Sequence, residues 1–234
     1  MNRRALTGLL VGGLVLLAGC AQTSVLARPG LAKPAAPARV LVMPADIELS
    51  VVRAGGLLEP RADWTEWAHL HVREALRAEL QARRAAVLEY ERPAEEAERS
   101  ADDRLVKLHD AVGAAIILHK YVPAFQQLPT KEGKFDWSLG AGAKRLRDRT
   151  GADYALFVVL RDSYASPGRA AAIVGAVLLH VIIPGGQQVG FASLVDLATG
   201  DIVWFNRLID PAGDLRQADP ARWAVRNLLA GLPL

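Results

Sequence analysis

The side chains most able to do chemistry in this chain are its five histidines and its single cysteine. His69 and His71 are two residues apart in a segment with helical periodicity, so they point to different faces and cannot share a metal ion as an i, i+4 pair does. His109 and His119 have no cysteine nearby and no paired-ligand spacing. The sequence therefore predicts no metal site and no cofactor.

Nucleophilic catalysis has one candidate group, which follows an apolar run. Ser163 and Asp162 are adjacent there, and a distant histidine, His109 or His180, would have to act as the base. The serine does not lie in a Gly-x-Ser-x-Gly elbow, and His180 lies in an apolar run where a buried, hydrogen-bonded histidine is the more frequent arrangement. We predict no catalytic residues, with a hydrolase that uses Ser163 and Asp162 as the alternative.

The cysteine closes an export signal. Two arginines occur in residues 1–4, residues 5–18 are almost wholly apolar, and the segment ends with Leu17-Ala18-Gly19-Cys20. As a helix the apolar run reaches about 21 Å, less than the roughly 30 Å of hydrocarbon in a bilayer. Residues 1–19 are therefore predicted to be a signal peptide and not a permanent membrane span.

The sequence Leu17-Ala18-Gly19-Cys20 resembles the lipobox of bacterial lipoproteins at every position. In that family the cysteine thiol receives diacylglycerol, the chain is cut before the cysteine, and the new amine is acylated. The resemblance implies lipidation of Cys20. It also implies a place on the periplasmic face of the outer membrane, because Ala21 stands where aspartate would retain the protein at the inner membrane. Cleavage by the ordinary signal peptidase, which would leave a free thiol, is the alternative.

The positive net charge of the chain belongs to its first 39 residues. The full chain has 28 basic and 25 acidic residues, and residues 20–39, rich in alanine and proline, are predicted to be an extended tether. Without Arg3 and Arg4 the excess is +1, and without Arg28, Lys33 and Arg39 it is −2 for residues 40–234. A nucleic-acid partner is therefore not predicted, because it requires clustered positive charge on a folded face.

Two groups of residues are candidates for a partner surface. Phe125, Phe135 and Trp137 lie in a segment without periodicity, where aromatic side chains are either buried in the core or presented to a partner. Arg161, Asp162 and Tyr164 follow a strand-like run and form the second group, with a structural hydrogen-bond cluster as the alternative. The predicted partners are the membrane, through lipid on Cys20, and either a second protein or another copy of the chain.

The elements that must position these residues alternate between strand and helix patterns. Strands are predicted at 39–43, 85–90, 154–160, 188–196 and 202–208, and helices at 63–84, 102–121, 138–150, 170–183 and 219–229. We expect a single α/β domain over 40–234, with a mixed sheet of about five strands, helices packed on it, and a C-terminal β-hairpin followed by a short helix. Gly200 is expected at the positive-φ position of that hairpin.

The run 170–183 is apolar except for His180. A helix buried on the sheet is the main interpretation. Contact with a lipid surface or with a neighbouring subunit remains as the alternative, because small residues at helical spacing permit close approach.

Two further segments carry a resemblance. Thr150-Gly-Ala-Asp-Tyr-Ala-Leu-Phe157 and Leu194-Val-Asp-Leu-Ala-Thr-Gly-Asp-Ile-Val-Trp204 are similar to a strand and a hairpin in several periplasmic lipoprotein families. These are the curli-secretion lipoproteins, the lipoprotein activators of penicillin-binding proteins, and the related amino-terminal domain of TolB. The resemblance implies an α/β domain in the cell envelope that binds proteins or assembles, without catalytic residues; the hydrolase alternative would then be an envelope hydrolase.

Overall fold

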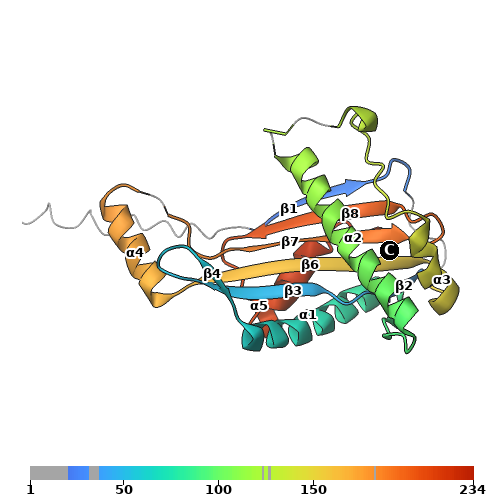
Figure 1. Ribbon diagram of the computed structural model, residues 1–234, viewed down its shortest axis with the longest axis horizontal. Coiled ribbons are helices and arrows are strands. Elements are labelled where there is room, and N and C mark those ends of the chain that lie inside the picture. Colours follow the sequence, from blue (N-terminus) through green and yellow to red (C-terminus); the bar gives the residue numbers. More distant parts are fainter. Residues whose placement is uncertain (1–20, 32–36, 123, 126–127, 182) are drawn as a thin grey trace, which may run out of the picture.

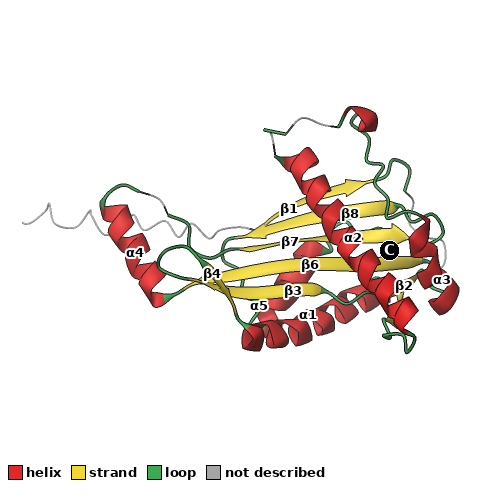
Figure 2. Cartoon of the chain, in the orientation of Figure 1, coloured by secondary structure: helices red, strands yellow, loops and turns green. Residues whose placement is uncertain are grey.

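The computed structural model describes residues 21–31, 37–122, 124–125, 128–181 and 183–234. Cys20 and the signal segment lie outside the described residues, as does part of the predicted tether. The described chain forms one mixed sheet of eight strands, with helices on both of its faces (Figures 1 and 2). The prediction of a mixed α/β sheet is confirmed, and three strands (β1, β3 and β4) add to the five predicted.

Strand β6 (Tyr154–Ala165) is the centre of the sheet. It pairs antiparallel with β7 (Gln188–Asp196) on one edge. On the other edge it pairs in parallel with β2 (Arg39–Val42) and then with β3 (Asp46–Val52). Residues 155–160 of β6 are all buried, as expected for a strand that is covered on both faces.

The predicted C-terminal hairpin is present, formed by β7 and β8 (Ile202–Asp210). Gly200 in its turn has a φ of 81°, and a Cβ built there would lie 2.0 Å from the carbonyl oxygen of Gly140. Glycine is therefore required by the backbone angle and by the close approach of another segment.

Three shorter strands lie at the margins of the sheet. Strand β5 (Ala86–Glu89) pairs in parallel with β2, and β4 (Leu58–Pro60) pairs antiparallel with β3. Strand β1 (Gln22–Ala27) pairs antiparallel with β8, so the prediction of an extended tether is wrong for these six residues. Pairing satisfies the edge of β8, which would otherwise present unpaired backbone groups.

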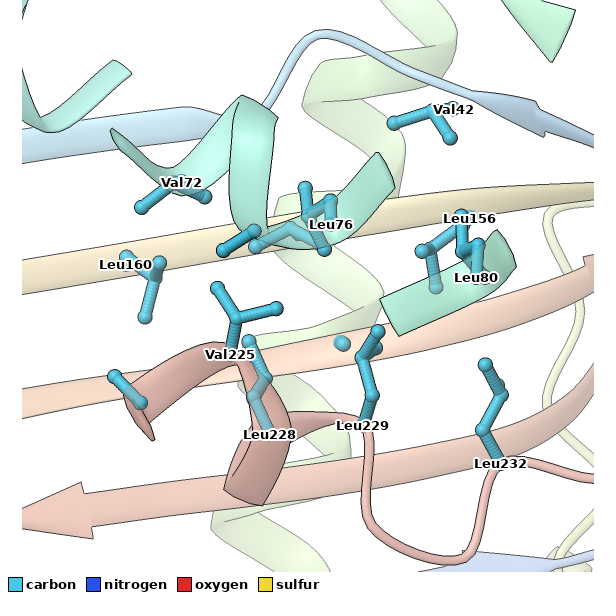
Figure 3. Packing of buried hydrophobic residues seen from close by; sticks show 14 of the residues in the cluster. Val42, Val72, Leu76, Leu80, Leu156, Leu160, Val225, Leu228, Leu229 and Leu232 are labelled. Atoms are coloured by element: carbon cyan, nitrogen blue, oxygen red, sulfur yellow. The ribbon is translucent and has the colours of Figure 1, made fainter. Parts of the chain in front are cut away.

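Helices cover both faces of the sheet. Helices α1 (Ala62–Ala82) and α5 (Ala218–Leu228) lie on one face, and α2 (Glu96–Tyr121) crosses the other (Figure 1). Figure 3 shows Val72, Leu76 and Leu80 of α1 gathered with Leu156 and Leu160 of β6 and with Val225 and Leu228 of α5. On the α2 face a second core contains Leu41, Ile116, Phe157, Phe191 and Phe205.

Several predicted boundaries shift. Strand β6 continues to Ala165, so residues 161–164 lie within it and not beyond its end. Helix α2 begins at Glu96, earlier than predicted. Ser138 does not cap a helix but bridges to Asp201, and α3 (Lys144–Thr150) begins six residues later, ending at Gly151 as predicted.

Helix α4 (Pro167–Leu178) corrects the interpretation of the run 170–183. It stands beyond the ends of the strands, beside the turn between β3 and β4 (Figure 1). None of its described side chains is buried, and Val174 and Val177 are 64% and 61% exposed. A helix buried on the sheet is therefore wrong for this segment, because the sheet ends before the helix begins.

Candidate functional site

The second predicted partner group is divided between the two faces of β6. Side chains alternate along a strand, so Arg161 shares the α2 face with Phe157 while Asp162 and Tyr164 share the other face with Leu160. The three residues therefore form no common surface. Asp162 and Tyr164 belong to a structural hydrogen-bond cluster, as the alternative interpretation predicts, whereas Arg161 pairs with Asp46 on the other face.

Asp162 is buried and holds the chain after β8 against β6. Its Oδ2 accepts a hydrogen bond from the Tyr164 hydroxyl, from the backbone N–H of Leu215 at 3.0 Å, and from Gln188 Nε2 at 3.3 Å. Burial raises the pKa of Asp162, while these donors oppose the shift. The Arg216 guanidinium lies 3.7 Å from the centre of the Tyr164 ring and covers the cluster.

Ser163 does not meet the requirements of a nucleophile. Its Oγ donates to the carbonyl of Gln187 at 3.1 Å and accepts from the backbone N–H of Gln187 at 3.0 Å. Asp162 points to the opposite face of the strand, so the two residues of the hydrolase alternative cannot act on one substrate atom. The two hydrogen bonds between Ser163 and Gln187 therefore stabilise the connection into β7.

A serine and a histidine do meet, but the serine is Ser193 and not Ser163. His109 Nε2 lies 2.9 Å from Ser193 Oγ, and the imidazole stacks on Phe157 with ring centres 4.7 Å apart. Both residues are buried, and burial lowers the pKa of His109 to about 3, so the ring is neutral at physiological pH. The nearest carboxylate contact, Asp110 Oδ1 to His109 Nδ1, is 4.0 Å, too long for a hydrogen bond. The pair is closed to substrate and links α2 to β7.

A pair of carboxyl groups, Asp46 and Asp110, lies beside this histidine. Asp46 binds Arg161 Nη2 at 2.6 Å and lies close enough to Asp110 for each carboxyl to shift the pKa of the other. Arg161 lowers the pKa of Asp46 against the opposing effect of burial, whereas burial and then Asp46 raise the pKa of Asp110 to about 6. Asp110 therefore holds its proton into a range where an ordinary carboxyl has lost it.

The aromatic group also separates. Phe135 and Trp137 are each 8% exposed and belong to the core on the α2 face. Phe125 is 49% exposed. A partner surface built on all three is therefore wrong, because the core takes two of them.

A cavity of about 490 Å³ opens where the chain passes from β2 to β3. Three of the polar side chains in its lining are already paired: Arg77 donates to Glu89 at 2.9 Å, and the Tyr90 hydroxyl donates at 2.9 Å to Asp102, which lies outside the lining. His69 lies on its wall, and burial lowers the pKa of that histidine. Within the described residues, no group of three or more His, Cys, Asp or Glu side chains is placed to bind a metal ion.

The most unusual exposed feature of the described chain is an apolar end. It comprises α4, residues 179–181 after it, the turn between β3 and β4, and Leu58 at the start of β4, and we call it the apolar end throughout. Its large exposed side chains are Leu57 (78%), Leu58 (62%), Val174 (64%), Val177 (61%), Leu179 (76%) and Val181 (49%). Exposed apolar groups gathered in this way mark contact surfaces. In the described part of the chain no helix is both long and apolar enough to span a bilayer.

Taken together, the fold and these sites define an α/β protein with one mixed sheet, buried polar links and an exposed apolar end. No family model matches the chain, and no curated protein matches it. Solved structures do resemble it. A PelC dodecamer from Paraburkholderia phytofirmans is 13% identical with a TM-score of 0.41, the match covering 90% of this chain and 96% of that one.

Two further structures are similar. The lipoprotein GNA1162 from Neisseria meningitidis is 14% identical with a TM-score of 0.33, covering 74% of this chain and 81% of that one. The C-terminal domain of LpoB from Salmonella enterica is 14% identical with a TM-score of 0.27, covering 78% and 87%. Identities and TM-scores this low transfer no function to the chain.

Proposed function

We propose that this chain is a lipoprotein of the bacterial envelope, anchored through Cys20 to the periplasmic face of the outer membrane, with a non-catalytic role in binding or assembly. The lipobox Leu17-Ala18-Gly19-Cys20 carries the proposal. More than one acyl chain gives lasting attachment, since burial contributes about 0.8 kcal/mol per methylene. Its partner is an envelope protein or a second copy of the chain.

The non-catalytic part of the proposal is supported by the placement of the reactive groups. Ser163 is bound to the backbone of Gln187, and Ser193 is buried against a neutral His109. A fluorophosphonate probe is expected to leave the native protein unlabelled. Labelling that disappears in Ser193→Ala or Ser163→Ala would establish a reactive serine and overturn this part.

The anchor is tested by growth with radioactive palmitate. The wild-type chain is expected to take up label and to fractionate with membranes, whereas Cys20→Ala is expected to do neither. Uptake of label by Cys20→Ala would overturn the assignment. Ala21→Asp tests the location separately: it is expected to remain lipidated but to move to inner-membrane fractions on a sucrose gradient.

A further inference from the structure

The apolar end lies at the end of the sheet where the described chain begins. Gln22 pairs with Ile209, which pairs with Val189, which pairs with Arg161. Strand β6 runs from Arg161 towards Ala165 and leads directly into α4. Because β1 runs antiparallel to β8, the start of β1 lies at this same end of the sheet (Figure 1).

The distance across the sheet between these features follows from the strand order. Four strand spacings of about 4.8 Å separate β1 from β3, or about 19 Å across the sheet. Cys20 precedes Gln22 by two residues, so no more than about 7 Å of chain lies between them. Helix α4 begins six residues beyond Arg161, the β6 residue level with Gln22, so the apolar end extends past the point where the chain enters the sheet, and acyl chains on Cys20 would bring it within reach of the same bilayer.

Helix α4 is attached firmly to the turn beside it. Ser166 caps the helix by accepting a hydrogen bond from Arg169 N–H at 3.1 Å, and Pro167 occupies its first turn. The Arg169 guanidinium donates to the carbonyl of Pro184 at 2.8 Å and to that of Ala54, between β3 and β4, at 3.3 Å. The helix and the turn thus present their apolar side chains as one unit.

The charge of this end matches a membrane surface. Residues 165–187 contain Arg169 and His180 and no acidic residue, although the domain as a whole carries more acid than base. Anionic headgroups attract such a segment, and apolar side chains beside it can enter the acyl boundary. A second protein surface would require no such exclusion of acidic residues.

We infer that the apolar end is a membrane-contact surface, in which Val174, Val177 and Leu179 of the α4 region, Leu57 of the β3–β4 turn and Leu58 of β4 enter the bilayer that holds the lipid anchor. The contact lies in the plane of the interface and does not span the membrane. It rests on the proposed function in one respect, since the acyl chains on Cys20 bring this end to the lipid. It also fixes how the rest of the domain faces the periplasm.

The test uses the full lipidated protein in vesicles that contain anionic phospholipid. Acylation consumes the only native cysteine, so Val174→Cys and Val177→Cys each supply a single free thiol for an environment-sensitive fluorophore. Ala198→Cys, exposed in the β7–β8 turn at the opposite end, is the matched control. Nitroxide groups on the lipid acyl chains are expected to quench the labels at 174 and 177 but not at 198.

Three results would overturn the inference. The first is that labels at 174 and 177 remain unquenched and exposed to water. The second is that these labels are shielded from water but not quenched by lipid, which would indicate contact with a second copy of the chain. The third is that the label at 198 is quenched as much as those at 174 and 177. Palmitate uptake tests the anchor independently. In a chain that keeps Cys20, uptake without quenching would refute the contact alone, quenching without uptake would refute the anchor alone, and the absence of both would refute both.

A second measurement uses charge in place of a label. The double variant Val174→Asp, Val177→Asp is expected to fold normally, because both side chains are exposed. In the unacylated Cys20→Ala background, it is expected to bind anionic vesicles at least about tenfold more weakly than its parent. Equal vesicle binding by the two chains would contradict a bilayer contact at these residues.

Discussion

At the residue scale, the polar groups inside this protein connect elements that are distant in sequence. Asp162 connects β6 to the segment after β8, Ser193 connects β7 to His109 of α2, and Asn206 connects β1 to α5. Each group is buried and hydrogen-bonded, which is the arrangement that keeps a polar side chain in a core without a large loss of stability. These groups therefore hold distant elements together by hydrogen bonds, and substituting them is expected to change the stability of the fold.

Asn206→Ala is expected to destabilise the protein by about 3 kcal/mol. The side chain accepts from Ser24 N–H at 3.0 Å and donates to the carbonyls of Asn227 and Leu228 at 3.0 and 2.8 Å, so its removal leaves buried backbone groups unpaired. Urea unfolding measures the change. Asn227→Ala, at a half-buried position, is the control, expected to change the free energy of unfolding by less than about 1 kcal/mol. Equal effects of the two variants on the free energy of unfolding would show that the buried Asn206 hydrogen bonds add no more stability than the half-buried Asn227 side chain does.

Asp110→Asn is expected to raise the melting temperature by an amount that grows with pH. The folded-state pKa of Asp110, about 6, lies above its ordinary value of 3.8, so the folded wild-type chain binds more protons than the unfolded chain between these values. Wild-type stability therefore falls from this source as pH rises through the window, and asparagine removes that loss. Melting curves at pH 4 and pH 7 test it, with Asp103→Asn on the same helix as the control. A stabilisation independent of pH, or a loss of stability at pH 7, would contradict the assignment.

At the element scale, α2 lies on the sheet because one of its positions has no side chain. A Cβ at Gly113 would lie 2.1 Å from Phe191 Cε2. Phe191 is held by rings on two sides, with centres 5.5 Å from Phe205 and 5.4 Å from His109. Neither the ring nor the helix can move without disturbing the second core.

Gly113→Ala is accordingly expected to destabilise the protein, although alanine favours a helix by about 1 kcal/mol. Overpacking costs about 1–3 kcal/mol, so the net effect is a loss. Gly175→Ala in α4 is the matched variant, since no atom lies within 4 Å of its Cβ position. It is expected to increase amide-exchange protection in α4 without lowering the urea midpoint. A stabilised Gly113→Ala protein would show that α2 packs less closely than described.

How far the sequence predicts this structure depends on the range of the interactions. The five predicted strands, the hairpin at Gly200 and the end of α3 at Gly151 depend on local pattern, and they are present. Strand β3 alternates acidic and apolar residues at Asp46–Leu49 and could have been predicted; β1 could not, because its partner β8 lies some 180 residues away. Arg161 and Asp162 lie on opposite faces of the sheet because β6 continues past them, and α4 is exposed because the sheet ends before the helix begins. The hydrophobic periodicity of the sequence predicts neither the end of β6 nor the end of the sheet.

At the scale of the whole molecule, the sheet acts as a spacer with two unlike ends. One end contains the start of β1, α4 and the β3–β4 turn, and the other contains α3 and the β7–β8 turn (Figure 1). The twelve residues of β6 span about 40 Å between them. If the first end contacts the bilayer, the second is held away from it, where its surface can meet a partner.

This geometry predicts that the membrane contact depends on where the anchored chain enters the sheet. A Gly/Ser linker of about 20 residues between Ala21 and Gln22 would add a mean span of about 25 Å and lower the effective concentration of the apolar end at the bilayer. Lipid quenching of a fluorophore on Val177→Cys is expected to fall, while the protein stays in the membrane fraction. The same linker between Glu91 and Arg92, in the exposed loop after β5, is expected to leave quenching unchanged. If the first insertion had no effect on quenching, β1 would not be what brings α4 to the membrane, and the apolar end would have to be held there by a contact of its own.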